Sequence, residues 1–370
     1  MKYYIIAGEA SGDLHGSNLM KAIYQIDPQA NIRFWGGDLM QQVGGTLVKH
    51  FKDLAFMGFW EVIKNLKTII KNLNFCKKDI AEFQPDAIIF IDYPGFNMRI
   101  AKWAKQQKIP THYYIAPQVW AWKENRVKDL KRDIDHLYVI LPFEKPYFEE
   151  KHQLKVHFVG HPLLDAITQF EKKPREEFLE ENHLDYQPII ALLPGSRKQE
   201  ILKKLPIMLE LEKSFPNHQL VIAGAPSLDA NFYLPILKNS KAKILYNQTY
   251  HLLSHAEAAA VTSGTATLET ALFEVPEVVC YKGNPISYWI AKRVITLPFI
   301  SLVNLIMEKE VVKELIQFDL NKENLLKEMR IILEPEHQEK LKETYRSLQK
   351  KLGGNGASER TAKLIFESLQ

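Results

Sequence analysis

The stretch "VTSGTATLETALFEVPEVV", residues 261–279, contains the turn that decides the fold. The small residues Ser263, Gly264 and Thr265 separate an apolar strand from a helix, and a second apolar strand ends the stretch. Such a unit predicts parallel strands buried on both faces. Free main-chain amides at the start of the helix can bind a diphosphate. Glu269, one turn into the helix, is placed to accept hydrogen bonds from ribose hydroxyls.

The same alternation of apolar strands and amphipathic helices runs through both halves of the chain, with a charged connector near residues 165–187. A chain of 370 residues is too long for one ordinary core. We therefore predict an α/β fold with two Rossmann-like domains that face each other across a cleft. The expected domains are residues 1–167, completed by a C-terminal helix at about 350–370, and residues 168–349.

Composition narrows the class of protein. Hydrophobic residues make up 46% and charged residues 25%, which is typical of a folded soluble protein. The net charge of +4 predicts no nucleic-acid partner. Cys76 and Cys280 lack metal-ligand spacing and indicate free thiols in a reducing compartment. With neither a signal peptide nor an uncharged run of about 20 residues, we expect a cytoplasmic protein that can still contact a membrane surface.

Two further motifs favour a ligand site. In LLPGSR, residues 192–197, a turn at Gly195 and Ser196 is followed by Arg197, whose guanidinium suits phosphate oxygens. In DYPGFN, residues 92–97, Asp92 ends an apolar strand and is a candidate general base. The alternative for Asp92 is a cap for a helix that begins at Asn97, or a residue that ties down the turn.

Two other motifs have structural and functional interpretations of equal weight. GEASGDLHG, residues 8–16, fits neither the dinucleotide nor the P-loop pattern, and Glu9 would repel a phosphate. Ser11 and Asp13 are expected to cap the next helix there. In APQVWAW, residues 116–122, Trp120 and Trp122 form either a wall of a sugar pocket or part of the core.

Six motifs in series resemble the lipid-A-disaccharide synthase family of two-domain GT-B glycosyltransferases. They are GEASGD (8–13), DYPGFN (92–97), APQVWAW (116–122), GHPLLD (160–165), LLPGSR (192–197) and SGTATLE (263–269). The family also has Leu-Pro-Asn in a late apolar segment, where this chain has Leu302-Val303-Asn304. Gln317 in KELIQ matches a late Glu-Leu-x-Gln element of the family.

The resemblance implies transfer of 2,3-diacylglucosamine from UDP-2,3-diacylglucosamine to the 6-hydroxyl of 2,3-diacylglucosamine 1-phosphate (lipid X). The products would be a β-1′,6-linked disaccharide 1-phosphate and UDP, made by inversion without a metal or another cofactor, in lipid A biosynthesis of a Gram-negative bacterium. Asp92 is the expected base, with Glu9 and His15 as alternatives. The expected UDP-sugar ligands are Gly195, Ser196, Arg197, Ser263, Gly264, Thr265, Glu269, Asn304 and Gln317. On the acceptor side we expect Ser11, Asp13, Asn97, Trp120 and Trp122.

The segment from Lys49 to Lys78 contains seven lysines against Asp53 and Glu61, a local charge of +5. Its apolar residues make it an amphipathic candidate for contact with the anionic inner-leaflet membrane surface. The contact residues would be Phe59, Trp60, Lys64 and Lys67, and the protein would be peripheral to the inner membrane. The alternative is an ordinary helix packed on the sheet. The sequence leaves open whether the protein forms a homodimer.

Two other functions fit the residues alone. One is another GT-B enzyme, such as a UDP-sugar epimerase or a glycosyltransferase with a water-soluble acceptor. The other is a non-catalytic binding protein with two α/β lobes, which would not need a carboxylate such as that of Asp92.

Overall fold

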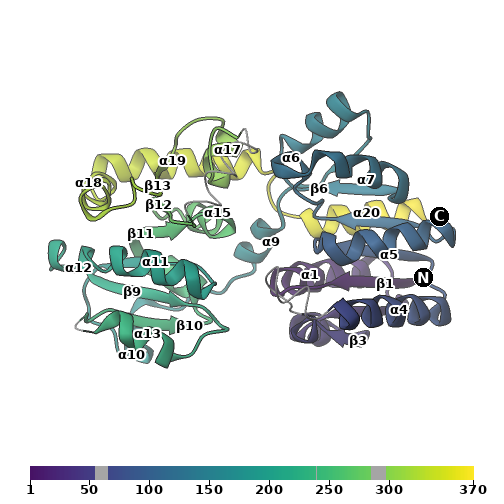
Figure 1. Ribbon diagram of the computed structural model, residues 1–370, viewed down its shortest axis with the longest axis horizontal. Coiled ribbons are helices and arrows are strands. Elements are labelled where there is room, and N and C mark those ends of the chain that lie inside the picture. Colours follow the sequence, from purple (N-terminus) through teal and green to yellow (C-terminus); the bar gives the residue numbers. More distant parts are fainter. Residues whose placement is uncertain (55–65, 239, 285–296) are drawn as a thin grey trace. The chain divides into compact units, whose positions relative to one another are not determined.

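The computed structural model describes residues 1–54, 66–238, 240–284 and 297–370, and it divides the chain into two compact units (Figure 1). Unit 1 comprises Met1–Thr168 and Leu352–Gln370, and unit 2 comprises Gln169–Lys351. Each unit is a parallel sheet covered by helices on both faces, so the expected α/β class is confirmed. Within the described residues, no helix has the length and apolar character needed to cross a bilayer.

The sheet of unit 1 has seven strands in the order β3-β2-β1-β4-β5-β6-β7. They are β1 (Lys2–Ala7), β2 (Asn31–Gly36), β3 (Thr46–His50), β4 (Ala87–Ile91), β5 (Thr111–Tyr114), β6 (His136–Val139) and β7 (His157–Phe158). All neighbouring pairs are parallel. The order reverses between β1 and β4.

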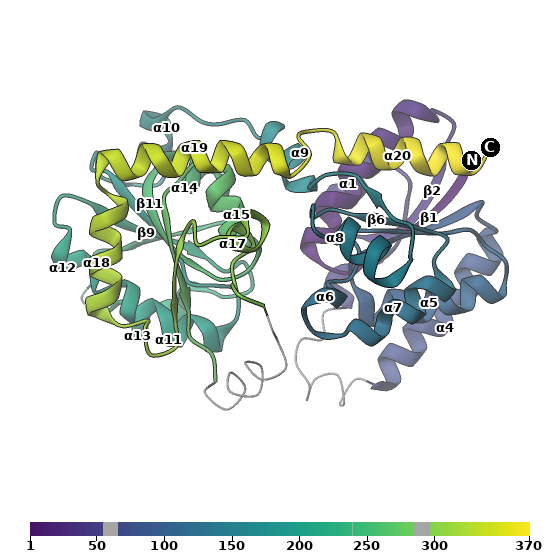
Figure 2. The same cartoon turned by 90° about the horizontal axis from the view of Figure 1, so that it is seen from above.

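Helices cover both faces of this sheet (Figure 2). One face carries α1 (Ala10–Ile26), α9 (Pro162–Thr168) and α20 (Ala357–Ser368), and the other carries α4 (Leu66–Phe83), α5 (Pro94–Gln106) and α7 (Val127–Asp133). Shorter helices of unit 1 are α2 (Asp38–Val43), α6 (Val119–Trp122), α8 (Glu144–Pro146), η1 (Phe51–Asp53), η2 (Glu124–Arg126) and η3 (Tyr147–Lys151).

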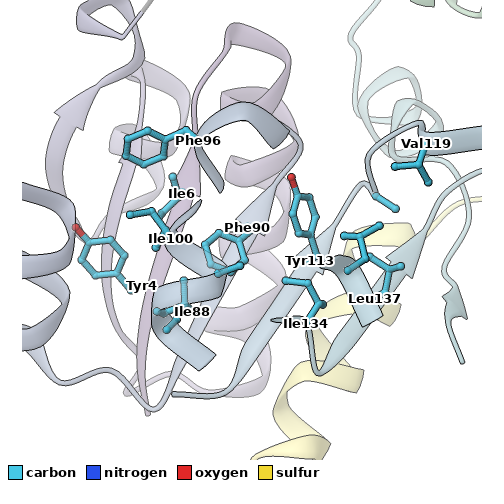
Figure 3. Close-up of a cluster of buried hydrophobic side chains, with 14 of the residues drawn as sticks. Tyr4, Ile6, Ile88, Phe90, Phe96, Ile100, Tyr113, Val119, Ile134 and Leu137 are labelled. Atoms are coloured by element: carbon cyan, nitrogen blue, oxygen red, sulfur yellow. The ribbon is translucent and has the colours of Figure 1, made fainter. Parts of the chain in front are cut away.

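The core between the sheet and α5 explains why the central strands are apolar throughout. Side chains from neighbouring strands, among them Ile88, Phe90 and Tyr113, pack against Phe96 and Ile100 of α5 (Figure 3). Every residue of β4 is buried because helices cover both faces. Cys76 belongs to this core, and both cysteines are buried and free, as expected.

The C-terminal helix α20 is fastened to unit 1 by the GHPLLD motif. The carboxylate of Asp165 accepts hydrogen bonds from the amides of Gly356 (2.6 Å), Ala357 (3.2 Å) and Ser358 (2.9 Å), which are free donors at the start of α20. The amide of His161 donates to the carbonyl of Leu352 at 3.0 Å. A motif near the end of the first segment therefore secures the last helix of the chain.

Unit 2 repeats the plan with six parallel strands in the order β10-β9-β8-β11-β12-β13. They are β8 (Ile189–Leu193), β9 (Gln219–Gly224), β10 (Lys243–Tyr246), β11 (Ala256–Thr262), β12 (Glu277–Tyr281) and β13 (Lys313–Ile316). The helices are α10 (Arg175–Glu181), α11 (Lys198–Met208), α12 (Leu211–Ser214), α13 (Ala230–Leu237), α14 (Thr249–His255), α15 (Thr265–Leu272), α17 (Leu302–Met307), α18 (Lys322–Ile332) and α19 (Pro335–Lys351). Helices α14, α15 and α19 lie on one face and α11 and α13 on the other (Figure 2).

Candidate active site

Both sheets reverse their strand order beside their first strand, at β1/β4 in unit 1 and at β8/β11 in unit 2. Open α/β sheets bind ligands outside the carboxyl ends of the strands at this point. Glu9 and Asp92 follow β1 and β4, whereas Arg197 and Ser263 follow β8 and β11. Four of the six motifs, at residues 8–13, 92–97, 192–197 and 263–269, therefore lie at the carboxyl ends of the strands at the switch points.

Asp92 has an unusual backbone conformation. Its φ is 44° and that of Tyr93 is 50°, so two consecutive non-glycine residues are left-handed. The main-chain carbonyl of Asp92 accepts hydrogen bonds from the Tyr113 hydroxyl (2.6 Å) and from Asn97 Nδ2 (2.8 Å). Strain of this kind is retained where neighbouring contacts fix it, and it is concentrated at functional sites.

The carboxyl group of Asp92 is chemically suited to accept a proton. Burial, together with the smaller effect of the nearby Glu9 carboxylate, raises its pKa to about 6. A general base works best when its pKa lies near the pH of the reaction. Asp92 is therefore ionised at neutral pH yet basic enough to take a proton from a hydroxyl.

The three glycines of GEASGDLHG serve close packing. A Cβ at Gly8 would lie 2.3 Å from Cδ1 of Tyr93, so Gly8 makes room for the residue that follows Asp92. A Cβ at Gly12 would lie 3.1 Å from that of Ala7, and one at Gly16 would lie 2.6 Å from Sδ of Met40. These residues let α1 approach the sheet.

The prediction that Ser11 and Asp13 cap the next helix is wrong, because α1 already begins at Ala10 with Glu9 as its N-cap. The buried Asp13 carboxylate instead accepts hydrogen bonds from the amides of Gly37 (2.7 Å), Leu39 (3.0 Å) and Met40 (3.0 Å) at the start of α2. Asp13 is thus committed to the fold, whereas Ser11 is exposed in the first turn of α1. The helix after Asp92 begins at Pro94 and has Tyr93 as its N-cap, so the alternative role of Asp92 as a cap is also wrong.

Asn97 and His15 are both buried inside unit 1. Asn97 Nδ2 donates to the carbonyls of Ile6 (3.3 Å), Ile91 (3.4 Å) and Asp92, so this side chain joins the ends of β1 and β4. Burial lowers the pKa of His15 to about 4, against the opposing effect of the Asp165 carboxylate. His15 is therefore neutral at pH 7.

The short helix α6, which carries Trp120, is held by a buried carboxyl group. Trp120 Nε1 donates to Glu144 Oε1 at 3.0 Å, and the Glu144 Oε2 atom accepts from the amides of Ile140 (3.0 Å) and Leu141 (2.9 Å). Burial raises the pKa of Glu144 to about 7. The side chain of Trp122 lies outside the described part of the structure, as do the residues Phe59, Trp60 and Lys64. Lys67 is exposed on α4.

Unit 1 contains a mainly apolar cavity of about 180 Å³. It is lined by Leu54, Ile69, Asn72, Tyr93, Gly95, Phe96 and Arg99. Tyr93 and Gly95 follow Asp92 in the same turn, so this turn contributes to the lining although Asp92 itself does not.

In unit 2, the turns after β8 and β11 expose main chain at the switch point. Gly195 has a φ of 112° and Gly264 a φ of 124°, values that favour glycine. Among the described residues, an added Cβ at Gly264 would meet no atom within 4 Å, so none of them fills the space beside this glycine. The Arg197 side chain is 72% exposed beside the first turn. Amides, a hydroxyl and a cation are thus available to an anion.

Glu269 is half-buried on α15 and accepts a hydrogen bond of 3.3 Å from the Tyr250 hydroxyl. Burial raises its pKa above the ordinary value. Among the residues that the structure describes, no group of three or more His, Cys, Asp or Glu side chains is arranged to hold a metal ion.

Comparison with known proteins covers nearly the whole chain. A family model described as lipid-A-disaccharide synthetase matches residues 3–367. A protein of Geobacter metallireducens named lipid-A-disaccharide synthase is 38% identical over 99% of this chain and 96% of its own length. The chain belongs to the lipid-A-disaccharide synthase family. Membership makes it a glycosyltransferase of lipid A biosynthesis and does not favour the epimerase alternative.

Solved structures agree on the fold. The glycotransferase of kitacinnamycin has a TM-score of 0.68 at 16% identity and covers 100% of this chain and 99% of its own. Staphylococcus aureus MnaA, solved with UDP, has a TM-score of 0.71 at 14% identity and covers 100% of this chain and 97% of its own. At such identities the likeness shows the GT-B fold alone.

Two residues aligned with late elements of the lipid-A-disaccharide synthase family differ in their surroundings. Asn304 is fully buried: Nδ2 donates to the Val312 carbonyl and to Glu314 Oε1, both at 2.9 Å, and Oδ1 accepts from the amides of Val311 (2.8 Å) and Val312 (3.0 Å). As placed, Asn304 has no hydrogen-bonding capacity left for a ligand. Gln317 follows β13, and its buried Nε2 has no hydrogen-bond partner among the residues that the structure describes.

The sequence did not predict three residues that lie around these sites. They are Tyr113, which fixes the Asp92 carbonyl, Glu144, which holds Trp120, and Lys204, which is buried beneath the turns of unit 2. Only Lys204 could have been noticed in the sequence, because it is a lysine at a position of α11 where the helical pattern predicts an apolar residue. A tyrosine and a glutamate that bond to main chain or indole leave no such pattern.

Proposed function

We propose that this chain transfers 2,3-diacylglucosamine from UDP-2,3-diacylglucosamine to the 6-hydroxyl of 2,3-diacylglucosamine 1-phosphate. The observation that carries the proposal is the carboxyl group of Asp92, held in a left-handed turn at the switch point of unit 1 with a pKa raised to about 6. The products are the β-1′,6-linked disaccharide 1-phosphate and UDP. The reaction inverts the donor configuration and needs no metal.

Unit 2 would bind the donor. The diphosphate would lie against the main-chain amides of residues 263–265 at the start of α15, with Ser196 and Arg197 beside it. Fixed donors and a guanidinium stabilise the negative charge that develops on the leaving UDP. Glu269 would accept hydrogen bonds from the ribose.

Unit 1 would bind the acceptor. Asp92 would take the proton of the 6-hydroxyl as that oxygen attacks the anomeric carbon, with Ser11 and Trp120 near the sugar. The apolar cavity beside Tyr93 and Phe96 is of the right character for part of an acyl chain. Arg99 at the rim of this cavity offers a positive charge close to the acceptor phosphate.

We further propose contact of unit 1 with the inner-leaflet membrane surface. The described part of α4 exposes Lys67, Lys71 and Lys78 together with Ile70 (50% exposed) and Phe75 (45% exposed). Cations beside apolar side chains attract anionic lipid and enter the interface. Flotation with anionic vesicles should occur at low salt and weaken at high salt, since salt screens the lysines. If the protein binds vesicles only as a homodimer, the fraction that floats should rise with the protein concentration.

One assay separates the proposed function from its alternatives. The protein is incubated with both acylated substrates, and UDP and the disaccharide 1-phosphate are measured by mass spectrometry. UDP release that depends on the acylated acceptor is expected. An epimerase would convert UDP-N-acetylglucosamine without any acceptor, a transferase with a soluble acceptor would use glucosamine 1-phosphate equally well, and a binding protein would release nothing. EDTA should leave the rate unchanged.

A further inference from the structure

Lys204 occupies a position on α11 that ordinarily belongs to an apolar residue. Its side chain is 2% exposed, and the neighbouring Ile201, Leu205 and Met208 on the same helix are fully buried. The Nζ atom donates a hydrogen bond to Oγ1 of Thr262 and lies 3.8 Å from Oε2 of Glu200. A buried ammonium group is thus held beneath the carboxyl edge of the sheet.

This ammonium group lies close to both turns of the proposed donor site. Thr262 is the last residue of β11 and directly precedes the Ser263–Thr265 turn. An added Cβ at Gly195, in the other turn, would lie 3.4 Å from Lys204 Nζ and 2.7 Å from Glu200 Oε2. The cation therefore lies under both segments that would surround a diphosphate.

Among the described residues, the charged groups around Lys204 leave its positive charge incompletely neutralised. Glu200 is shared with Arg197, whose Nη1 lies 3.7 Å from Oε1. Cys280 of β12 also faces Lys204, but burial raises the pKa of its thiol to about 12, so it is uncharged at neutral pH. Burial lowers the pKa of Lys204 itself. A second negative charge nearby would stabilise the ammonium form.

We propose that Lys204 is a positioning residue for the donor diphosphate: its ammonium group holds Thr262 and the following turn, and its charge attracts the phosphates above them. The inference rests on the proposed binding of the UDP-sugar by unit 2. A purely structural lysine would be a poor choice at this position, because replacement of a buried charge by a well-packed apolar side chain is often neutral or stabilising.

Calorimetry with UDP and with uridine tests the proposal in the full-length chain. Lys204→Met should weaken UDP binding roughly tenfold to hundredfold, the usual range for the loss of one charged interaction, while uridine binding stays the same. Lys203→Met, at the more exposed neighbouring position, is the matched control and should bind UDP as the unchanged chain does. Thermal unfolding without ligand should show Lys204→Met at least as stable as the unchanged chain.

Proton uptake gives a readout that a structural role would not change. Because UDP should raise the pKa of Lys204, its binding to the unchanged chain should take up protons in a series from pH 7.5 to 10, measured in buffers of different ionisation enthalpy. Lys204→Met should abolish this uptake. Lys204→Arg should abolish it as well but keep part of the affinity, since arginine stays protonated. Thr262→Val, which removes the acceptor but not the charge, should weaken UDP binding yet leave the uptake.

Two results are kept distinct. If the unchanged chain does not bind UDP, the donor site itself is wrong and the role of Lys204 falls with it. A different result would overturn only the role of Lys204. In that case the unchanged chain binds UDP, Lys204→Met and Thr262→Val bind it within about twofold of the same affinity, and Lys204→Met takes up as many protons as the unchanged chain.

Discussion

The hydroxyl of Tyr113 donates a hydrogen bond of 2.6 Å to the main-chain carbonyl of Asp92, across neighbouring strands β5 and β4. This bond helps to hold Asp92 in its left-handed conformation. Tyr113→Phe keeps the ring in the core but removes a bond of about 1 kcal/mol. We expect kcat to fall about fivefold to tenfold, with little change in the affinity for UDP. Tyr138→Phe, which removes a hydroxyl bonded to His112 on the next strand, is the control and should leave kcat unchanged.

Asp92→Asn should retain UDP binding and lose about 10²–10⁴-fold in turnover, the usual contribution of a general base. In the unchanged chain, kcat/KM should rise with pH around an apparent pKa of about 6, because only the ionised carboxylate accepts the proton. Glu9→Gln removes a negative charge that raises this pKa, so the rise should move to lower pH. Near-normal turnover of Asp92→Asn, or an unmoved profile in Glu9→Gln, would contradict the assignment.

Arg197→Ala should raise the Kd for UDP roughly tenfold to hundredfold, since charged hydrogen bonds to phosphate contribute most to anion binding. Stability should not change, because the side chain is 72% exposed and its nearest acidic partner is 3.7 Å away. Lys198→Ala, at the adjacent exposed position, serves as the control. Equal Kd values for both variants in calorimetry would remove Arg197 from the donor site.

Asp13→Asn should lower the free energy of unfolding by about 1–2 kcal/mol, because one amide oxygen cannot replace the carboxylate that accepts from three main-chain amides. The KM for the acceptor should stay the same. Urea denaturation and steady-state kinetics measure the two quantities. A raised KM without loss of stability would instead restore Asp13 to the acceptor side.

Glu277→Gln should change how stability depends on pH. Glu277 is fully buried on β12, and neither carboxyl oxygen has a hydrogen-bond partner in the part of the chain that the structure describes. Burial raises its pKa well above the ordinary value. The folded state therefore keeps a proton that the unfolded state has lost, and the free energy of unfolding falls as pH rises, by up to about 1.4 kcal/mol per pH unit in that window. The variant should lack this fall and be more stable at pH 8.

The control for Glu277 is Glu310→Gln, whose carboxylate lies at 3.0 Å from Lys313 Nζ and is half exposed. Its stability should follow that of the unchanged chain across the pH range. Parallel pH curves for the unchanged chain and for Glu277→Gln would show that burial does not hold the proton on Glu277.

Local patterns in the sequence predicted the sheets and the turns after their strands. The turn before Thr265 and the strand that ends before Asp92 were readable because apolar strands, small residues and turn residues follow one another within a few positions. The alternation of strands and helices was enough to predict two parallel α/β units. These features depend on residues that are neighbours along the chain, so they can be predicted from a single sequence.

The remaining features depend on residues distant in sequence. Asp13 caps a helix that begins at Asp38 rather than its own, and Tyr113 bonds to a carbonyl on another strand. The bonds that surround Asn304 come from a later segment, 311–314. No spacing rule predicts such partners, because the packing of the units brings them together.

The fastening of α20 by Asp165 also bears on the order in which the chain folds. Unit 2 is an uninterrupted segment inserted between Thr168 and Leu352, so all of its strands have left the ribosome before α20 is made. Unit 1 has its whole sheet early, yet one face of that sheet waits for α20 until all of unit 2 has been made. The apolar surface that α20 finally covers is exposed during that interval.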